Sequence, residues 1–459
     1  MEESTRRRFL RTTAVVGGVG IAGCIDGEEE PVPEDDDDTD PEPPENGENG
    51  EEEVAYEVWA FDQGTDTGYI YQPADGDGDG DSAFELVDEI DVQALDEVAD
   101  VDSFIPHMVD FTSDYEYAAV PGTGGAQTLI FRVESRELVA AIDTGPGSHF
   151  AGFGPDDSYL QVDVIGEGAI KRVDIDWENE EFDIVDEIDT NELHDEFDGS
   201  DPICHQHTGN GYSYHTLGPS YHDGALVVVD TEEFEVEKIF THDEVPSNCG
   251  TVPHPTEDKF YLTAGLPTPT DEDGEPVEGE EGVGEWYVFD TETNQPIDTE
   301  GNVVGEDEEF TSEDIARSTE GVDAHGFWFT PDASELWVLN RETNDGLVID
   351  PETDDVIEEV APYGPAEHAD DTDQRDAPDI MWASPDGEYM FVTLRGPNPQ
   401  SGDPHAATGV NAGFSVLDIE TRDIEEVVQP APDDEGSDFH GIGVVPLAAE
   451  GEFTSPVYR

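Results

Sequence analysis

Residues 324–360 read AHGFWFTPDASELWVLNRETNDGLVIDPETDDVIEEV and are the clearest indication of how this chain folds. They contain four short apolar or alternating runs, separated by turn-forming residues such as those at 331–334. Runs of this length that are rich in β-branched and aromatic residues, with tight turns between them, predict a four-stranded antiparallel meander. A single meander cannot bury both of its faces, so we expect further copies along the chain.

Six further segments align with this one when each is placed on the first turn, which a proline starts in most copies. The residue six positions before that turn is polar in every copy and is usually histidine. The seven positions are His107, His149, His205, Cys249, His325, Asp379 and His440. Seven irregular copies of one meander predict an all-β fold, a seven-bladed β-propeller of four-stranded antiparallel blades.

The two ends of the chain predict how the ring closes. The copy at His440 has only one strand before the chain ends, whereas residues 58–92 contain runs that match the three missing strands. The N-terminal strands would pair with the C-terminal inner strand, which removes open sheet edges. From about Glu57 onward, the repeats and their Pro-Asp-Gly-type turns resemble YVTN-type propeller repeats, a resemblance that implies the fold and no particular activity.

The first 23 residues have the features of an export signal. Adjacent arginines at positions 6–8 precede a short, glycine-rich apolar run, which indicates twin-arginine export. The run is too short to span a bilayer. Residues 21–24, Ile-Ala-Gly-Cys, resemble a lipobox, which predicts lipidation of Cys24 and a protein anchored to the outer face of the cell membrane. A noncovalently retained anchor and plain secretion are the alternatives.

Residues 24–53 are acidic and rich in Pro, Gly and Asn, which predicts a disordered tether and leaves 54–459 for the propeller. The chain carries 117 acidic and 16 basic residues, a net charge of −101. Such a chain repels itself, nucleic acid and anionic lipid at low salt, and molar salt screens the repulsion. We therefore expect a salt-adapted monomer that has no nucleic-acid partner. Two acidic inserts, 267–285 and 296–320, are expected as loops on one rim.

The seven aligned positions predict a metal site, because equivalent positions on the inner strands of a propeller face one another around the axis. Five of the 13 histidines occupy these positions, and imidazole suits zinc or copper. The candidate ligands are His107, His149, His205, His207, His325, His440, Asp379 and Cys249. The alternative is a structural layer in which these side chains hydrogen-bond the neighbouring blade and axial water.

Within this set, His205 and His207 are expected to form the core of the site. Alternate residues of a strand share a face, so both can point toward the axis while Cys204 and Gln206 point away. Asp379 is expected to orient a histidine, and the glycines that follow His325 and His440 to leave room beside the ring. By contrast, His215 and His222 are expected at strand surfaces.

Two cysteines remain once Cys24 is assigned to lipid. Cys204 and Cys249 begin adjacent blades, and in an oxidising exterior they form a plausible disulfide. A disulfide would remove Cys249 from the ligand set, so these two interpretations exclude each other.

Residues 204–228, CHQHTGNGYSYHTLGPSYHDGALVV, resemble the corresponding segment of propeller-type extracytoplasmic zinc metallochaperones. This resemblance implies metal binding and delivery to the solute-binding protein of a metal transporter. Two other classes stay open: a surface scaffold or adhesion propeller, and a redox propeller related to nitrous oxide reductase or cytochrome cd1. The chain has neither a His-His pair nor a C-x-x-C-H haem attachment motif. No nucleophile elbow or phosphate loop occurs, which favours a non-catalytic protein.

Overall fold

The computed structural model describes residues 55–74, 82–98, 101–197, 199–218, 220–248, 250–271, 276–366 and 374–447. The chain divides into two compact units, Met1–Glu52 and Glu53–Arg459, and all described residues belong to the second. The predicted export signal, the predicted tether, the predicted lipidation site Cys24, and Cys249 lie outside the described residues. No helix within the described part is both long enough and apolar enough to cross a membrane.

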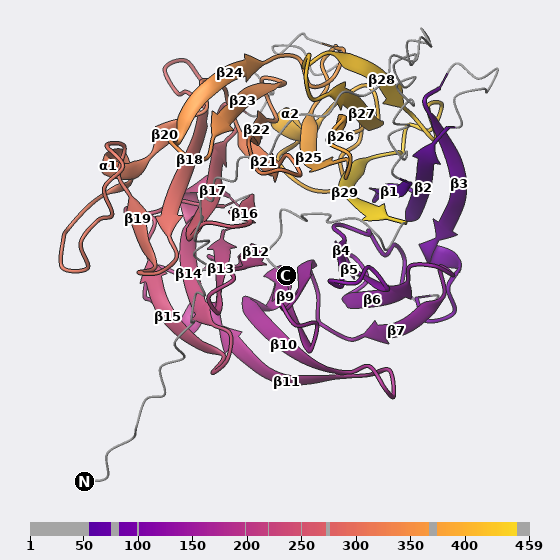
Figure 1. Cartoon of the computed structure of the whole chain (residues 1–459), viewed down its shortest axis with the longest axis horizontal. Coiled ribbons are helices and arrows are strands. Elements are labelled where there is room, and N and C mark those ends of the chain that lie inside the picture. The colour runs from indigo at the N-terminus through magenta and orange to yellow at the C-terminus, as the bar shows by residue number, and fades with distance from the viewer. Residues whose placement is uncertain are drawn as a thin grey trace, which may run out of the picture. The chain divides into compact units, whose positions relative to one another are not determined.

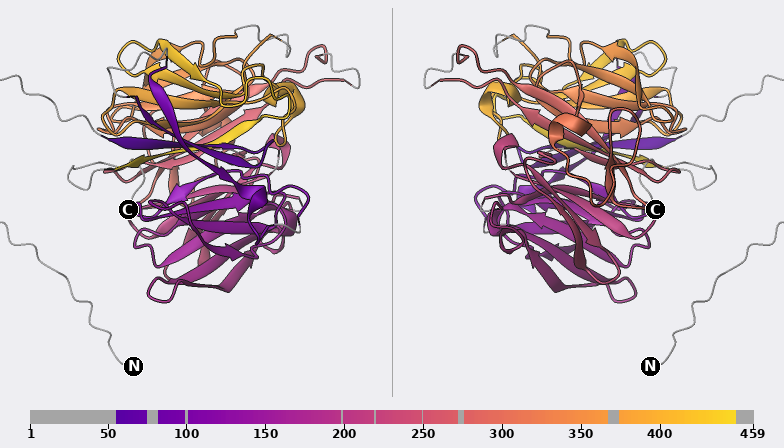
Figure 2. Two further views of the ribbon diagram at one scale, coloured as in Figure 1. Left: turned by 90° about the vertical axis from the view of Figure 1, so that its right-hand side faces the viewer. Right: turned by 90° about the vertical axis from the view of Figure 1, so that its left-hand side faces the viewer.

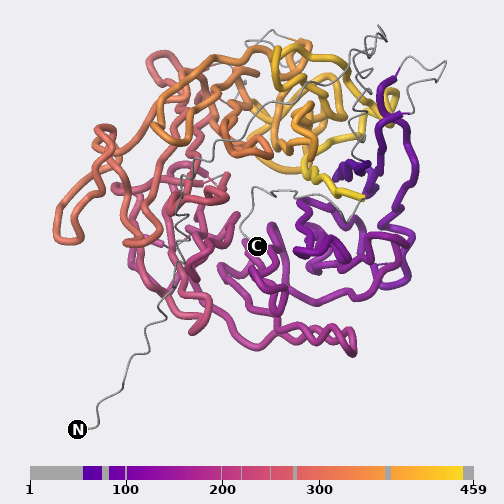
Figure 3. Tube along the Cα trace, in the orientation of Figure 1, coloured from indigo at the N-terminus to yellow at the C-terminus, as the bar shows by residue number. Residues whose placement is uncertain are grey.

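Seven antiparallel sheets form a closed ring, which confirms the predicted seven-bladed β-propeller (Figure 1). Six sheets have four strands, and the fifth in chain order has an additional short strand. In each blade the first strand lies near the axis and the last at the periphery, and the tube trace follows this course from blade to blade (Figure 3).

The first three blades contain the following strands. Blade 1 consists of β29 (Phe439–Pro446), β1 (Tyr56–Asp62), β2 (Thr67–Pro73) and β3 (Phe84–Asp91). Blade 2 consists of β4 (Asp110–Phe111), β5 (Tyr117–Gly122), β6 (Gln127–Arg132) and β7 (Leu138–Ile142). Blade 3 consists of β8 (Ser148–Phe153), β9 (Tyr159–Val164), β10 (Ala169–Asp176) and β11 (Glu181–Asp189).

The remaining blades follow in chain order. Blade 4 consists of β12 (Pro202–His207), β13 (Tyr212–Leu217), β14 (Ala225–Asp230) and β15 (Glu235–Phe240). Blade 5 consists of β16 (Thr251–Pro253), β17 (Lys259–Leu266), β18 (Val283–Asp290) and β19 (Gln295–Ile297), with β20 (Arg317–Ser318) beside β18. Blade 6 consists of β21 (Ala324–Phe329), β22 (Leu336–Asn340), β23 (Asp345–Asp350) and β24 (Asp355–Val360). Blade 7 consists of β25 (Pro378–Ala383), β26 (Tyr389–Leu394), β27 (Gly413–Asp418) and β28 (Ile424–Val428).

Short helices occur only in the connections of the described chain. They are α1 (Ser312–Ile315), α2 (Pro404–Ala407) and the 3-10 turns η1 (Val92–Ala94), η2 (Ile165–Glu167), η3 (Thr190–Glu192) and η4 (Tyr221–Asp223). Both inserts were expected to be loops. The second one, however, contains α1 and β20. Arg317 of β20 pairs with Trp286 of β18, which widens blade 5.

The ring closes as predicted, by antiparallel pairing of β1 with β29. The pairing runs from Tyr56 opposite Pro446 to Asp62 opposite Phe439. Asp62 reinforces this closure, because its carboxylate accepts hydrogen bonds from the backbone N–H of Asp438 at 2.9 Å and the hydroxyl of Ser437 at 2.7 Å. The side views show the indigo N-terminal strands next to the yellow C-terminal part of the chain, as the pairing of β1 with β29 requires (Figure 2).

The hydrophobic core lies between neighbouring blades. Trp328 of blade 6 packs against Trp382 of blade 7 with ring centroids 3.9 Å apart, and Tyr214 of blade 4 stacks on Phe260 of blade 5 at 4.3 Å. Outer strands such as β24 are mostly exposed and rich in glutamate, whereas β22 is fully buried. This gradient places apolar surface between the sheets and acidic residues on the periphery. The ends of the inner strands therefore converge on a central cavity.

Candidate metal centre

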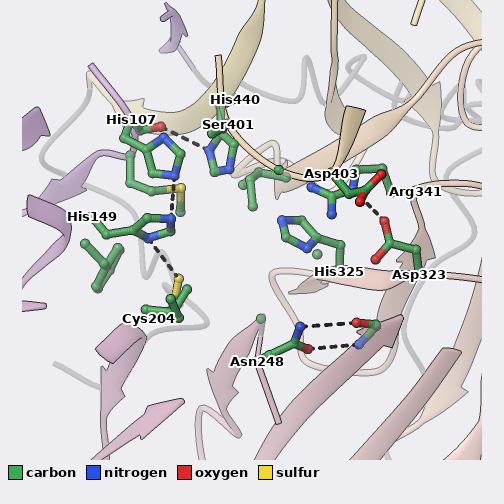
Figure 4. A pocket seen from close by; sticks show the side chains of 18 of the residues that line it. His107, His149, Cys204, Asn248, Asp323, His325, Arg341, Ser401, Asp403 and His440 are labelled. Carbon is green, nitrogen blue, oxygen red and sulfur yellow. Dashed lines mark hydrogen bonds and ion pairs between the residues drawn. The ribbon is translucent and has the colours of Figure 1, made fainter. Parts of the chain in front are cut away.

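The central cavity has a volume of about 900 Å³ and is lined by inner strands and by two groups of loop residues, 266–270 and 400–404. Its apolar wall includes Trp328, Trp382 and Met381. Its polar wall includes four histidines from four blades: His107, His149, His325 and His440 (Figure 4). A mostly apolar cavity with a few converging polar side chains is the usual form of a ligand site.

His107 and His149 form the closest contact within this group. Their Nε2 atoms lie 2.8 Å apart, and Nδ1 of His107 lies 3.1 Å from Oε1 of Gln63. The amide of Gln63 is oriented by Asp438, whose Oδ2 accepts a hydrogen bond from Nε2 of Gln63 at 2.8 Å. His107 therefore donates from Nδ1 and accepts at Nε2, and His149 is the donor between the two rings. Nδ1 of His149 is then an acceptor, 3.9 Å from Sγ of Cys204.

His440 stacks on His107 with ring centroids 3.8 Å apart. Its Nδ1 donates to the backbone carbonyl of His107 at 3.1 Å, which leaves Nε2 as the acceptor nitrogen. The adjacent Gly441 permits this packing, because a Cβ at that position would lie 2.5 Å from the same carbonyl oxygen. Gly326 meets the carbonyl oxygen of Asp379 at the same distance. These glycines were expected to leave room beside the ring, but the backbone of the neighbouring blade occupies that room.

Asp379 lies behind the histidines and contacts one of them, as expected. Its carboxylate lies 2.8 Å from Nε2 of His325 and 3.7 Å from Nε2 of His440. Arg395 contacts it at 2.6 Å and Arg341 at 3.5 Å. Burial alone would raise the pKa of Asp379, but the surrounding histidines and arginines hold it well below its ordinary value. This carboxylate is thus an ionised acceptor that two guanidinium groups contact.

The imidazoles of His107, His149 and His440 are neutral at pH 7. Burial lowers the pKa of His149 to about 4 and places the pKa values of His107 and His440 well below the ordinary imidazole value. Neutral imidazole is the form that binds a metal, so burial keeps these side chains ready to act as ligands.

Two subsets of these donors have spacings close to those of metal ligands. Tetrahedral zinc with bonds of about 2.0–2.1 Å holds its ligand atoms about 3.3 Å apart. The Nε2 atoms of His107 and His149 are 2.8 Å apart, so the rings need only separate slightly. The ligand atoms of His325, Asp379 and His440 all lie within 4.8 Å of one another.

Strand β12 presents a different face to the axis from the one expected. Cys204 lies beside His149 (Figure 4). His205 borders the cavity, but its Nδ1 is bound to Asp163 at 2.5 Å. His207 lies against Tyr159 with ring centroids 5.5 Å apart, and it is not among the described residues that line the cavity. A register shift between Pro202 and Cys204 explains this, because it displaces the alternation of the strand.

Several site residues were not predicted. Both His215 and His222 were expected at strand surfaces. His215 is fully buried against Asp163, and His222 is exposed but lies in the 3-10 turn η4 and borders the central cavity. Asp163 had a detectable signal, because an acidic residue within the apolar run YLQVDV is costly to bury without a partner. Gln63 and Arg395 gave no such signal, since they lie far from their partners in the sequence. The disulfide of Cys204 with Cys249 involves a residue outside the described chain.

No protein-family model matches this chain, and no curated protein matches it. The dihydro-heme d1 dehydrogenase NirN in complex with DHE matches with a TM-score of 0.48 and 12% identity, over 84% of this chain and 74% of that one. Apo AztD from Citrobacter koseri matches with a TM-score of 0.45 and 11% identity, over 86% of this chain and 99% of that one. These likenesses concern the fold alone and carry no argument about ligand or activity.

Proposed function

We propose that this propeller is a metal-binding protein that holds a zinc or copper ion on its axis. The observation that carries the proposal is the set of hydrogen bonds behind the histidines. Nδ1 of His107 donates to Gln63 and Nδ1 of His440 donates to a backbone carbonyl, so the Nε2 atoms of both rings are available as ligands. Metal-binding histidines usually donate the other ring N–H to such an acceptor, which fixes their tautomer and orientation.

The proposed ligands are His107, His149 and His440, from three consecutive blades. The ring of His440 must move toward the other two when the ion binds, because the three ligand atoms do not all lie within 4.8 Å of one another. Nε2 of His149 adjoins that of His107, and its proton can move to Nδ1 when a metal binds. Asp379 is a positioning residue in this proposal and not a ligand, because its carboxylate already contacts His325, Arg341 and Arg395. His325 contacts Asp379 from the opposite side of the cavity and is a further candidate ligand.

The role we propose is metal binding and delivery at the outer face of the membrane. The net charge of −101 concentrates cations near the protein surface, which supports uptake of a metal ion. Loop residues such as Thr268 and Ser401 border the cavity beside the inner strands, and we propose that the ion enters past them. The solute-binding protein of a metal transporter is the partner that suits this role, with a lipid on Cys24 keeping both proteins at the membrane.

Titration of metal-free protein with zinc and Cu(II) in molar salt tests the binding. The double variant His149→Gln/His440→Gln should bind the axial ion at least about 100-fold more weakly, because two neutral ligands are lost. His194→Gln is the matched control, since His194 is an exposed histidine on a connection of blade 3. Unchanged affinity and stoichiometry for both metals in the folded double variant would contradict the proposal and favour a scaffold propeller.

Anchoring has its own test. The variant Cys24→Ser should release the protein from the membrane fraction into the medium, because the thiol that would carry the lipid is gone. Retention of that variant in the membrane fraction would instead support a noncovalent anchor.

A further inference from the structure

A second histidine cluster lies between blades 3 and 4, and the axial site does not use it. Asp163 of β9 accepts from Nδ1 of His205 at 2.5 Å and from Nδ1 of His215 at 2.7 Å, one bond on each carboxylate oxygen. His205 and His215 stand opposite each other on β12 and β13, with their rings stacked 4.5 Å apart. All three side chains are fully buried. Two imidazoles from blade 4 thus converge on one carboxylate from blade 3.

The charge of this cluster is not balanced by a permanent cation. Its two ion-pair partners in the described chain are imidazoles, and no lysine or arginine contacts Asp163. Asp379, by comparison, has two guanidinium partners. A buried carboxylate is costly unless a cation or several donors compensate it, and a divalent metal would supply the missing charge.

Buried polar atoms beside the cluster lack hydrogen-bond partners. They are Nε2 of His205 and both side-chain polar atoms of Gln161. His205 places Nε2 2.8 Å from the position that a Cβ of Gly152 would take, and Gly152 is the cross-strand partner of Gln161. Directly opposite residues of an antiparallel pair share a face, so Gln161 and Nε2 of His205 are neighbours. Unsatisfied buried groups are rare and call for an explanation, such as a missing ion or water.

We propose that Asp163, His205 and His215 form a second metal site, which binds a zinc-class divalent ion through the carboxylate and the two Nδ1 atoms. Two imidazoles and one carboxylate are a common ligand set for such metals. The present N–O distances of 2.5 and 2.7 Å are shorter than the separation of about 3.3 Å around a tetrahedral ion, so each ring must retreat by well under about 1 Å.

Metal loading also accounts for the unsatisfied atoms. When Nδ1 of each ring binds the ion, the proton it donated to Asp163 moves to Nε2 of the same ring. Nε2–H of His205 then faces the side chain of Gln161, whose carbonyl oxygen is a free acceptor. Nε2–H of His215 faces the hydroxyl oxygen of Ser213, which is already 3.0 Å away. Both rings would thus gain the acceptor that metal-binding histidines usually have. Since His205 also borders the axial cavity, the ion has a path to the site.

Zinc titration of the metal-free full-length protein in molar salt, followed by metal analysis, tests this site separately from the axial one. The wild type should bind one more equivalent than Asp163→Asn and His215→Gln, which keep similar volume but lose a ligand. The axial variant His149→Gln/His440→Gln should retain that equivalent. If both interblade variants keep the wild-type stoichiometry, the second site is refuted whatever the axial variant does. If only the axial variant keeps its full metal content, the proposed function fails and the second site stands.

A measurement on the wild type guards against variants that do not fold. Zinc-edge anomalous diffraction from crystals soaked in zinc should give a peak between Asp163, His205 and His215. A peak at the axis alone, with none between blades 3 and 4 at saturating zinc, would overturn the inference and identify water as the group beside Gln161.

Discussion

Nε2 of His107 and Nε2 of His149 lie 2.8 Å apart, although the two residues belong to different blades. The contact depends on how blade 2 packs against blade 3, and not on any feature within one strand. The same holds for the contact of Asp163 in blade 3 with His205 in blade 4. Both candidate metal sites therefore lie where neighbouring blades meet. The distances between their side chains depend on the packing of one sheet against the next.

The neutral buried histidines predict acid sensitivity of the metal-free protein. Their pKa values are lowered in the folded state, to about 4 for His149, whereas the unfolded chain titrates near pH 6.5. The unfolded state then binds more protons as the pH falls, so stability is full above about pH 6.5 and is lost between about pH 6.5 and 4. His149 alone accounts for roughly 3 kcal/mol of this loss at most.

Urea unfolding at constant molar salt with a chelator present would measure this dependence. The variant His149→Gln should show a shallower loss of stability on acidification, and His194→Gln should follow the wild type. Equal urea midpoints at pH 7 and pH 5 for the wild type would contradict the prediction. The buried Asp379 and Arg395 face the same histidines and stay charged over this range.

Arg395 is predicted to make a large contribution to the free energy of unfolding through its contacts with Asp379 and Asp438. Its guanidinium contacts Asp438 at 2.8 Å and Asp379 at 2.6 Å, and all three side chains are fully buried. Arg395→Met would leave two buried carboxylates without this partner, which should cost about 3–5 kcal/mol in the free energy of unfolding. Arg395→Lys should recover only part of this, since a single ammonium cannot match the planar fork. Lys238→Met on β15, at a partly exposed position, should change stability by less than about 0.5 kcal/mol. Equal stability of Arg395→Met and Lys238→Met would refute the prediction.

Asp62 is predicted to secure the closure of the ring. Asp62→Ala leaves the N–H of Asp438 and the hydroxyl of Ser437 without their acceptor, which should lower the free energy of unfolding by about 2–4 kcal/mol. Asp62→Asn keeps one carbonyl oxygen and should lose about half as much. Chemical denaturation with tryptophan fluorescence would follow the change, because Trp59 lies on the same strand. An Ala variant no less stable than the Asn variant would mean that strand pairing alone closes the ring.

Low salt is predicted to unfold the protein, because its net charge of −101 is repulsive when unscreened. The Debye length grows from about 3 Å at 1 M salt to about 30 Å at 0.01 M, so the melting temperature should fall steeply over that range. Sucrose at equal osmolality should not replace the salt, since it does not screen charge. A melting temperature that is the same at both salt concentrations would count against salt adaptation.

The sequence alone determined the fold and its closure. Turn residues and alternating runs are local signals, and they recur often enough in 324–360 and its copies to define seven blades. The strands missing after His440 were identifiable in the segment that became β1, β2 and β3, because each half of blade 1 carries its own pattern. The aligned positions also identified His107, His149, His325, Asp379 and His440, which the fold brings to one cavity or its immediate wall.

Only the tertiary structure decided which side chains of the inner strands meet. Register shifts occur near the start of β8, β12, β21 and β25, and each displaces the alternation that a regular strand would have. A shift of one residue moves a side chain to the opposite face. In β12 it places Cys204 beside His149 and turns His205 toward Asp163. Local sequence does not reveal these shifts, because they lie where neighbouring blades approach closely, as at Gly326 of β21 against the carbonyl of Asp379.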